Sequence, residues 1–204
     1  MKLKLSFKVH LYSCLRFYIA YIILIGLSLI LKYIANIDNG LYYSYVIIAS
    51  TLFSIILGIY EYLIVLHTYL NLQPNPRAFW VQSIFANLIN SIICMLVVLI
   101  INVILLASGY SMYFNLILPM LILFIFAYSV GALGYVLLHR IKYLNVVSII
   151  VLVIALIFAG HIIHDFIILI LNHYLTLILP QIILFILSII FEGLIIFRLN
   201  RFIK

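Results

Sequence analysis

Long apolar runs separated by short polar breaks make up most of this chain. A helix of about 20 apolar residues crosses a bilayer, because it rises roughly 1.5 Å per residue and the hydrocarbon core is about 30 Å thick. The pattern therefore predicts an all-α integral membrane protein, with a single transmembrane domain over residues 1–204. It contains six predicted spans: Phe17–Ile37, Tyr42–Leu66, Val81–Ala107, Leu116–Leu138, Leu144–Gly160 and Pro180–Phe197.

The distribution of basic residues decides how the last third is interpreted. Residues 162–179 are apolar enough to be a further span. With only six spans, however, Lys32 is the one Lys or Arg of eleven that falls on the outer side, and cytoplasmic segments are enriched in these residues. We therefore predict that residues 160–179 form a non-spanning, re-entrant external helical segment. Both termini of this multi-pass plasma-membrane protein are then cytoplasmic.

Residues 1–16 have the pattern of an interfacial helix. They carry Lys2, Lys4, Lys8 and Arg16 among apolar residues that recur at i, i+4 along one stripe. Such amphipathic helices lie in the membrane interface. We expect an N-terminal interfacial elbow that leads into the first span.

Two polar features are expected at the end of the first span. Only a short apolar stretch precedes Lys32, so its side chain is predicted to extend outward to the membrane surface. The sequence Asp38-Asn39-Gly40 then predicts a tight turn into the second span.

Small residues recur at helical spacing in two spans. Ser50, Ser54 and Gly58 lie at i, i+4, i+8 in the second span, and Ala127 and Gly131 form a similar pair in the fourth. Such stripes let helix backbones approach closely within a membrane. We expect both stripes to be helix-packing surfaces.

The third span carries a polar face. Its members are Ser83, Asn87, Asn90, Ser91 and Cys94. Polar side chains at this spacing should turn away from lipid. Two interpretations stay open: hydrogen bonding between helices, or a face that lines a substrate pathway or a dimer seam.

Two acidic residues lie inside predicted spans, near their cytoplasmic ends. Glu61 lies in the second span and Glu192 in the sixth. A carboxylate within a membrane is costly unless it is paired or hydrated. Glu192 is expected to pair with a terminal arginine; alternatively, both acids help to anchor a cytoplasmic gate or ATPase contact.

The polar break at residues 67–80 is the most distinctive loop. Residues 67–72 can continue as a helical turn, and Pro74 and Pro76 are expected to stop it because proline lacks an amide donor. Arg77 is the only full charge in the loop, and Trp80 lies where aromatic residues mark the headgroup level.

This loop resembles the coupling loop between the second and third spans of ABC exporter permeases of the type-two, ABCG-like family. There a short helix, a turn, an arginine and aromatic residues dock on the ATPase subunit. The resemblance rests on residues 67–71, 74–76, Arg77 and Phe79-Trp80. The ATPase-coupling residues that it implies are His67, Tyr69, Asn71, Pro74, Pro76 and Arg77. The interfacial elbow, the six spans and the external segment fit the same family.

The resemblance implies a permease subunit that forms half of an export pathway. It would dimerise with itself or with a second permease, and separate ABC ATPase subunits would bind ATP and Mg. By analogy the substrate is a hydrophobic or amphipathic peptide or small molecule, such as a toxin or bacteriocin, in export or immunity.

Composition and missing motifs narrow the alternatives. With 69% hydrophobic and 7% charged residues the chain has no room for a soluble domain. No Walker A loop, HExxH helix or GxSxG elbow is present, so we predict that this chain is not itself an enzyme and holds no cofactor. The net charge of +7 lies in small groups between spans, which does not indicate nucleic-acid binding. Cys14 and Cys94 lie in different segments and are not expected to form a disulfide.

Two other functions remain open. His161, His164 and Asp165 have a spacing that could hold a metal on one helix face, with His173 nearby, as in an intramembrane metal-binding protein or enzyme. The other alternative is a membrane immunity or assembly protein without ATPase partners.

Overall fold

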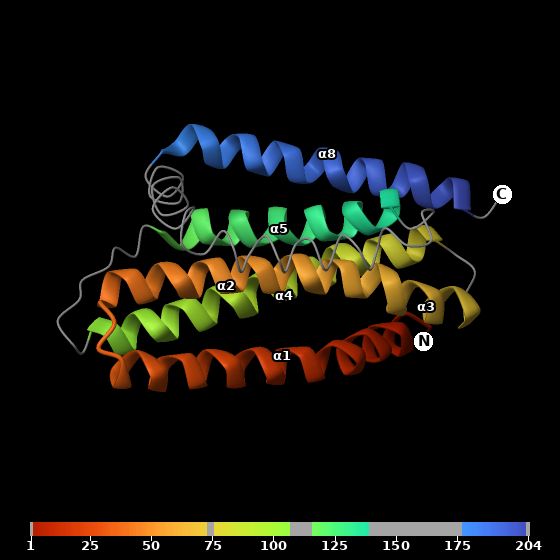
Figure 1. The fold of residues 1–204 in the computed structure, drawn as a ribbon. Coiled ribbons are helices and arrows are strands. Elements are labelled where there is room, and N and C mark those ends of the chain that lie inside the picture. Colours follow the sequence, from red (N-terminus) through yellow and green to blue (C-terminus); the bar gives the residue numbers. More distant parts are fainter. Residues whose placement is uncertain (1, 73–75, 107–115, 139–176, 203–204) are drawn as a thin grey trace.

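The computed structural model describes residues 2–72, 76–106, 116–138 and 177–202, and all regular structure in them is helical. Its elements are α1 (Lys2–Ile34), α2 (Asn39–Tyr60), the π-helical turn η1 (Glu61–Val65), α3 (Leu66–Leu72), α4 (Pro76–Leu106), α5 (Ile117–Leu138) and α8 (Ile178–Phe202) (Figure 1). Five helices in the described ranges are long and apolar enough to cross a membrane: Cys14–Ile34, Asn39–Leu70, Arg77–Leu105, Ile117–Leu137 and Ile178–Leu199. The chain is thus an all-helical protein of the multi-pass membrane type. The predicted fifth span and nearly all of the predicted external segment lie outside the described residues.

The long helices lie side by side in a bundle (Figure 1). α1, α2, α4 and α5 alternate in direction along the chain, whereas α8 runs in the same direction as α5. The start of α1, the short helix α3, the start of α4 and the end of α8 all lie at one end of the bundle, which we call the α3 end. α5 therefore ends at the α3 end, whereas α8 begins at the opposite end of the bundle.

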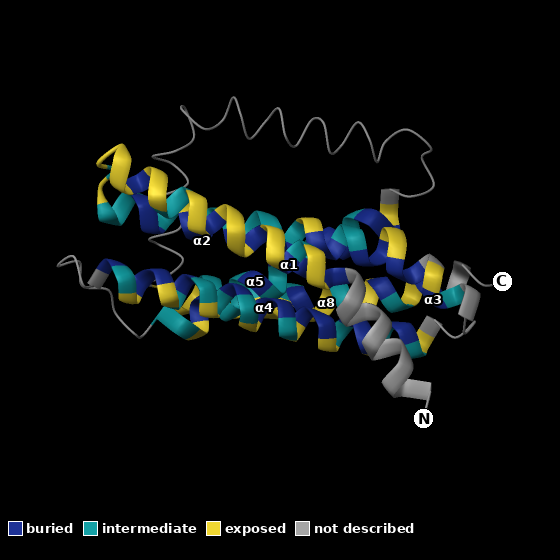
Figure 2. Cartoon of the chain, turned by 90° about the horizontal axis from the view of Figure 1, so that it is seen from below, coloured by how far each residue is buried: buried dark blue, intermediate teal, exposed yellow. Residues whose placement is uncertain are grey.

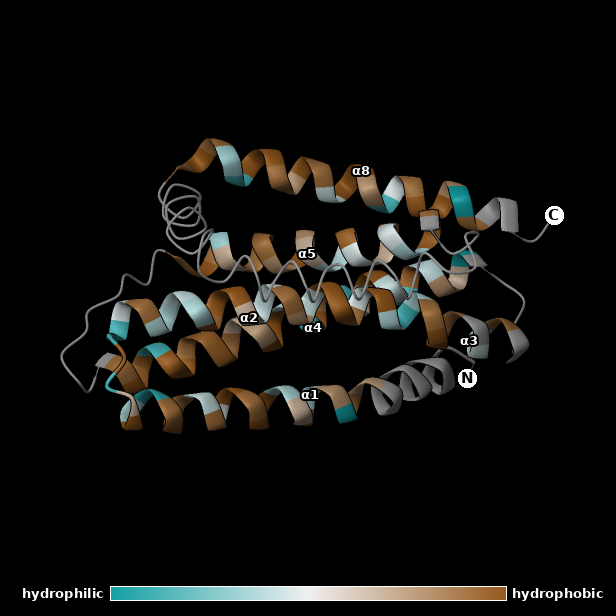
Figure 3. Ribbon diagram, viewed as in Figure 1, coloured by the Kyte–Doolittle hydropathy of each residue, from teal (hydrophilic) through white to brown (hydrophobic). Residues whose placement is uncertain are grey.

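α5 is the central helix, and α1 and α8 lie on the outside. Half of the most apolar stretch of α5 is buried within the chain, against 22% for α1 and 17% for α8. The exposed surfaces of both outer helices are apolar, with side chains such as Leu24, Ile34 and Ile189 more than half exposed (Figures 2 and 3). Such surfaces suit contact with lipid chains.

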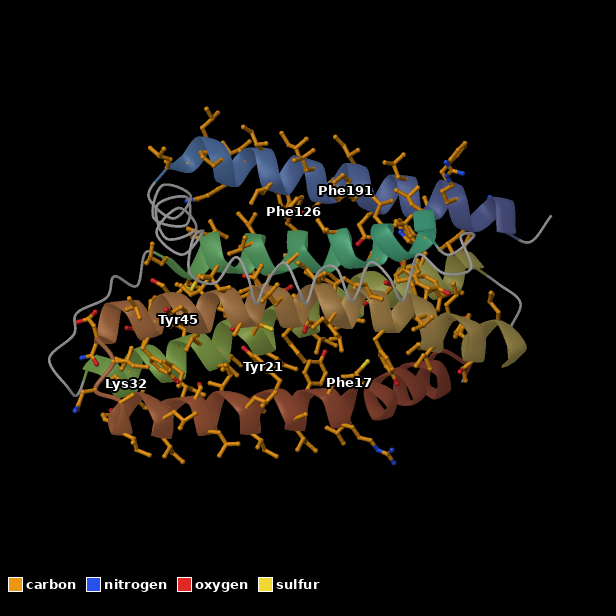
Figure 4. All side chains as sticks on the ribbon, viewed as in Figure 1. Phe17, Tyr21, Lys32, Tyr45, Phe126 and Phe191 are labelled. Carbon is orange, nitrogen blue, oxygen red and sulfur yellow. The ribbon has the colours of Figure 1, made fainter. Side chains whose placement is uncertain are left out.

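The first hairpin differs from its prediction in two respects. α1 is one helix from Lys2 to Ile34, so the predicted elbow joins the first span without a helix break. Near the end of this helix the Lys32 side chain is only 5% exposed, and its Nζ lies 4.3 Å from the centre of the Tyr33 ring (Figure 4). The turn comes earlier than expected: Asn36 adopts a positive φ of 49°, and Asp38 caps α2 by accepting from the amides of Gly40 and Leu41 at 2.9 and 3.2 Å. Asparagine tolerates this left-handed conformation and aspartate is a preferred N-cap.

The two small-residue stripes meet where α2 crosses α5. A Cβ added at Gly131 would lie 2.1 Å from the carbonyl oxygen of Ile55, and one added at Gly58 would lie 2.3 Å from that of Tyr128. Ala127 is buried in the same crossing region of α5. The two backbones are therefore in direct contact, as the stripes predict.

α5 contacts α8 through larger side chains. Phe126 stacks on Phe191 with ring centroids 5.7 Å apart (Figure 4). The outer helix α1 packs through aromatic residues as well, with Phe17 against Tyr60 at 4.3 Å between centroids and Tyr21 stacked on Phe53 at 4.2 Å. Aromatic contacts thus attach both outer helices to the central ones.

Candidate functional site: a buried polar network and the groove beside it

The polar face of α4 points into the bundle. Ser83, Asn87, Asn90 and Ser91 are at most 3% exposed within this single chain. Asn90 donates to Ser54 of α2 and Asn87 donates to Ser129 of α5, so the structure favours hydrogen bonding between helices over a seam that faces a second copy. Asn87 alone among them also lines a groove, which is described below.

One half of the network joins α1, α2 and α4. The Tyr21 hydroxyl hydrogen-bonds the Ser50 hydroxyl. One turn along α2, Ser54 accepts from Asn90 Nδ2 at 3.1 Å. Cys94 is buried with its Sγ 3.5 Å from Ser54 Oγ, and neither Cys94 nor Cys14 forms a disulfide. Among the described residues these contacts join only α1, α2 and α4, and they fix how these three helices pack.

The other half joins α4, α5 and α8. Asn87 Nδ2 donates to Ser129 Oγ at 3.2 Å and to the Ile125 carbonyl at 3.3 Å. Ser91 donates to Asn87 Oδ1 at 3.3 Å, and Ser129 donates to Glu192 Oε1 at 3.0 Å. A chain of donors thus leads from α4 through α5 to the carboxylate on α8.

The hydrogen bond that Glu192 receives differs from the predicted pairing with a terminal arginine. Arg198 is exposed, the side chain of Arg201 lies outside the described part, and the donor to Glu192 Oε1 is Ser129. Its other oxygen, Oε2, is buried without a hydrogen-bond partner among the described residues. Sequence reasoning missed Ser129 because a single serine in an apolar span has no periodic partner. Its one signal is its position between the small residues Ala127 and Gly131, in a helix predicted to pack closely.

Glu61, the second acidic residue, is more deeply buried in the bundle than Glu192. Glu61 opens the π-helical turn η1 and is only 1% exposed. Glu192 of α8 and Ser83 of α4 lie near it. Single π-helical turns within α-helices occur often at functional sites. The structure therefore brings the two predicted acids into one region, near the α3 end of the bundle.

A groove of about 430 Å³ runs between α4 and α8, with Ile125 of α5 at its base. Apolar side chains form most of its surface, including Ile84, Leu88, Phe185 and Ile189. Four polar or amphipathic residues also line it: Trp80 and Asn87 from α4, and Ser188 and Glu192 from α8. The groove and the second half of the polar network thus share Asn87 and Glu192.

The predicted coupling loop is held against the bundle. α3 ends at Leu72, as expected for a helix before prolines, but Pro76 begins α4 instead of stopping a helix, so α4 starts before the predicted Val81. Proline suits a first helical position because no amide donor is needed there. Tyr69 is buried, with its ring centroid 5.5 Å from that of Phe79, whereas Arg77 is exposed. Tyr69 therefore supports the loop from inside the bundle.

Several predicted site residues cannot be placed. The side chains of His67, Asn71, Pro74 and Pro76 lie outside the described part, as do His161, His164, Asp165 and His173. Among the residues that are described, no three His, Cys, Asp or Glu side chains form a group that could hold a metal ion.

No family model matches this chain, and neither a curated protein nor a solved structure is similar to it. The network and the groove are therefore interpreted from their geometry.

Replacing Asn90 by leucine is expected to destabilise the bundle only slightly. Ser54 keeps its own hydrogen bond to the Ser50 carbonyl at 3.0 Å, so the substitution leaves no orphaned group. Hydrogen bonds between membrane helices contribute about 0.6 kcal/mol on average and about 1.7 kcal/mol at most. Reversible unfolding in mixed micelles of a mild detergent and dodecyl sulfate measures the change. A loss above about 3 kcal/mol would show that Asn90 does more than join α4 to α2.

Proposed function

We propose that this chain is the permease subunit of an ABC exporter for hydrophobic or amphipathic molecules, and that separate ATPase subunits drive it. The observation that carries the proposal is the arrangement of the short helix α3 and the start of α4. A short helix, α3, ends before the prolines, and α4 then begins at Pro76 with Arg77 exposed beside it. A coupling element needs such a short helix with an exposed basic residue beside it, both firmly packed against the spans.

The end of the bundle that carries this loop is also the basic end. Lys2 and Arg16 lie toward it on α1, Arg77 lies at the start of α4, and Arg198 and Arg201 lie near the end of α8. By the positive-inside rule we place this end in the cytoplasm, where an ATPase subunit could reach α3.

The parallel course of α5 and α8 supports the count of six spans. Chain that leaves α5 at one end and enters α8 at the other crosses the membrane an odd number of times. One crossing by Leu144–Gly160 satisfies this requirement, with residues 160–179 as the external segment. The bundle would then be half of a pathway, completed by a second copy or a sibling permease.

The contacts of α3 suggest how force would pass from an ATPase into the bundle. Tyr69 of α3 contacts Phe79 of α4, and Phe79 also meets Tyr62 of η1 edge-on at 5.3 Å between centroids. The same apolar cluster includes Val136 of α5 and Ile195 of α8. Displacement of α3 would therefore move α4 relative to α5 and α8, as rocking between inward-open and outward-open states requires.

The first test is purification of the tagged chain from its native membrane in a mild detergent, followed by mass spectrometry. We expect an ABC ATPase to co-purify, and expect replacement of residues 74–77 by a Gly-Ser linker to remove it. The matched control replaces residues 109–112 by the same linker, because these residues follow α4, which ends at the opposite end of the bundle. Absence of any ATPase from the unmodified chain would overturn the proposal and favour a membrane protein without ATPase partners.

Reversing the charge of Arg77 to glutamate is expected to uncouple the complex. Because Arg77 is exposed, Arg77→Glu should leave the bundle folded while its new charge weakens the ATPase contact. Permease-stimulated ATP hydrolysis in nanodiscs should fall at least about tenfold, a factor that corresponds to about 1.4 kcal/mol. The control Arg198→Glu makes the same change on α8, and equal losses in both variants would argue against a specific role for the loop.

A further inference from the structure

The size of the groove between α4 and α8 matches small-molecule sites. Its volume of about 430 Å³ lies within the range of roughly 300–1,000 Å³ typical of such sites. Mostly apolar walls with few polar groups are also typical of them, because the apolar area provides affinity and the polar groups fix orientation. The occupant should therefore be a small molecule with an apolar body.

The charge on the residues that line the groove determines whether the bound molecule should be a cation or an anion. Glu192 is the one ionisable group among the lining residues. Ser129 holds its Oε1 at 3.0 Å, whereas Oε2 has no hydrogen-bond partner among the described residues. A buried carboxylate oxygen in apolar surroundings is costly unless it is paired, so a positive charge in the groove would be stabilised.

The aromatic lining favours an organic cation over a metal ion. Trp80 of α4 lines the groove together with Glu192 of α8, and aromatic rings attract organic cations, most strongly where water is excluded. A small inorganic cation keeps strongly bound water that apolar walls do not replace. A cation whose charge is surrounded by hydrocarbon loses little hydration on entry.

We infer that this groove binds a small amphipathic organic cation, with its charge at Glu192 and its apolar body between α4 and α8. Ser129 and Asn87 position the carboxylate through their hydrogen bonds. The interpretation of the groove as the site of a transported substrate rests on the proposed function. It specifies that this substrate is a small molecule with a positive charge. As a binding site it needs no ATPase, so a binding measurement on the purified chain can fail or succeed independently of the co-purification experiment.

The test uses tetraphenylphosphonium as the cation and tetraphenylborate as an anion of the same shape and similar hydrophobicity. Trp80 is the one tryptophan of the chain, so its emission reports directly from the groove. In an uncharged detergent, titration with the cation should change Trp80 emission in a saturable manner. The anion should bind at least about tenfold more weakly, because it meets the carboxylate without a compensating charge.

Two variants and a control locate the site. Glu192→Gln should weaken cation binding at least about tenfold and reduce the difference between cation and anion. Gly193→Leu keeps the carboxylate but fills the groove, and should also weaken binding; a Cβ at Gly193 meets no atom within 4 Å, so the helix accepts a side chain there. Asp38→Asn removes the same charge from the opposite end of the bundle and keeps a good helix cap, so it should bind as the unmodified chain does.

Three results would overturn the inference, each with variants that remain monodisperse in size-exclusion chromatography. One is equal affinity for the cation and the anion. Another is unchanged cation affinity in Glu192→Gln. The third is equal weakening by Asp38→Asn and Glu192→Gln, which would indicate a general charge effect.

Discussion

Replacing Gly131 by alanine is expected to destabilise the bundle by about 1 to 3 kcal/mol, the usual cost of overpacking a tight core. The added Cβ would lie 2.1 Å from the carbonyl oxygen of Ile55, and this atom belongs to backbone that no rotamer change can move. α2 and α5 must therefore separate, although their crossing is the most extensive contact between the described helices. Unfolding in mixed micelles, followed by Trp80 emission, measures the loss.

Gly134, one turn further along α5, provides the matched control. A Cβ at Gly134 meets nothing within 4 Å. Gly134→Ala should be neutral or stabilise by up to about 1 kcal/mol, because alanine is the better helix former. Replacing glycine by alanine is thus expected to lower the stability of the bundle at Gly131, and to leave it unchanged or raise it at Gly134, three positions away. Equal effects at the two positions would show that α2 and α5 do not cross closely at Gly131.

Replacing Phe79 by alanine is expected to cost about 3 kcal/mol and to loosen the loop. Phe79 is 1% exposed and contacts Tyr62 and Tyr69, so its loss leaves a cavity where η1, α3 and α4 meet. Two measurements check this prediction: the unfolding transition, and the rate of tryptic cleavage after Arg77. Cleavage should accelerate because α3 and the start of α4 lose their shared contact.

Phe85 is the control for this prediction, since it lies on the same helix but is 55% exposed. Phe85→Ala should change stability by less than about 0.5 kcal/mol and leave the cleavage rate unaltered. If Phe79→Ala behaved like Phe85→Ala, the aromatic cluster would not be what holds α3 to the bundle.

The apolar pattern predicts much of the fold, because length and hydropathy decide which segments can span a membrane. The helices predicted from Tyr42, Val81, Leu116 and Pro180 all occur, with ends that differ by several residues. The burial of Asn87 and Asn90 also follows from helical spacing, because polar groups avoid lipid.

Other features depend on contacts between distant segments, which spacing alone does not reveal. Glu192 has arginines close to it in sequence, yet its hydrogen bond comes from Ser129, on a helix that is separated from it along the chain by many residues. A proline such as Pro76 can either stop one helix or start the next. Here it starts α4, and the packing of Phe79 against Tyr69 stabilises this arrangement.

The position of α8 also affects the biosynthesis of this protein. Because α8 is made after α5, Ser129 and Asn87 enter the membrane before their carboxylate partner exists. A nascent chain interrupted before α8 would expose these polar groups and the apolar surface of α5 that Phe191 otherwise covers. Such a surface is suited to recognition by membrane chaperones or intramembrane proteases, so arrival of α8 would mark the point at which the bundle escapes degradation.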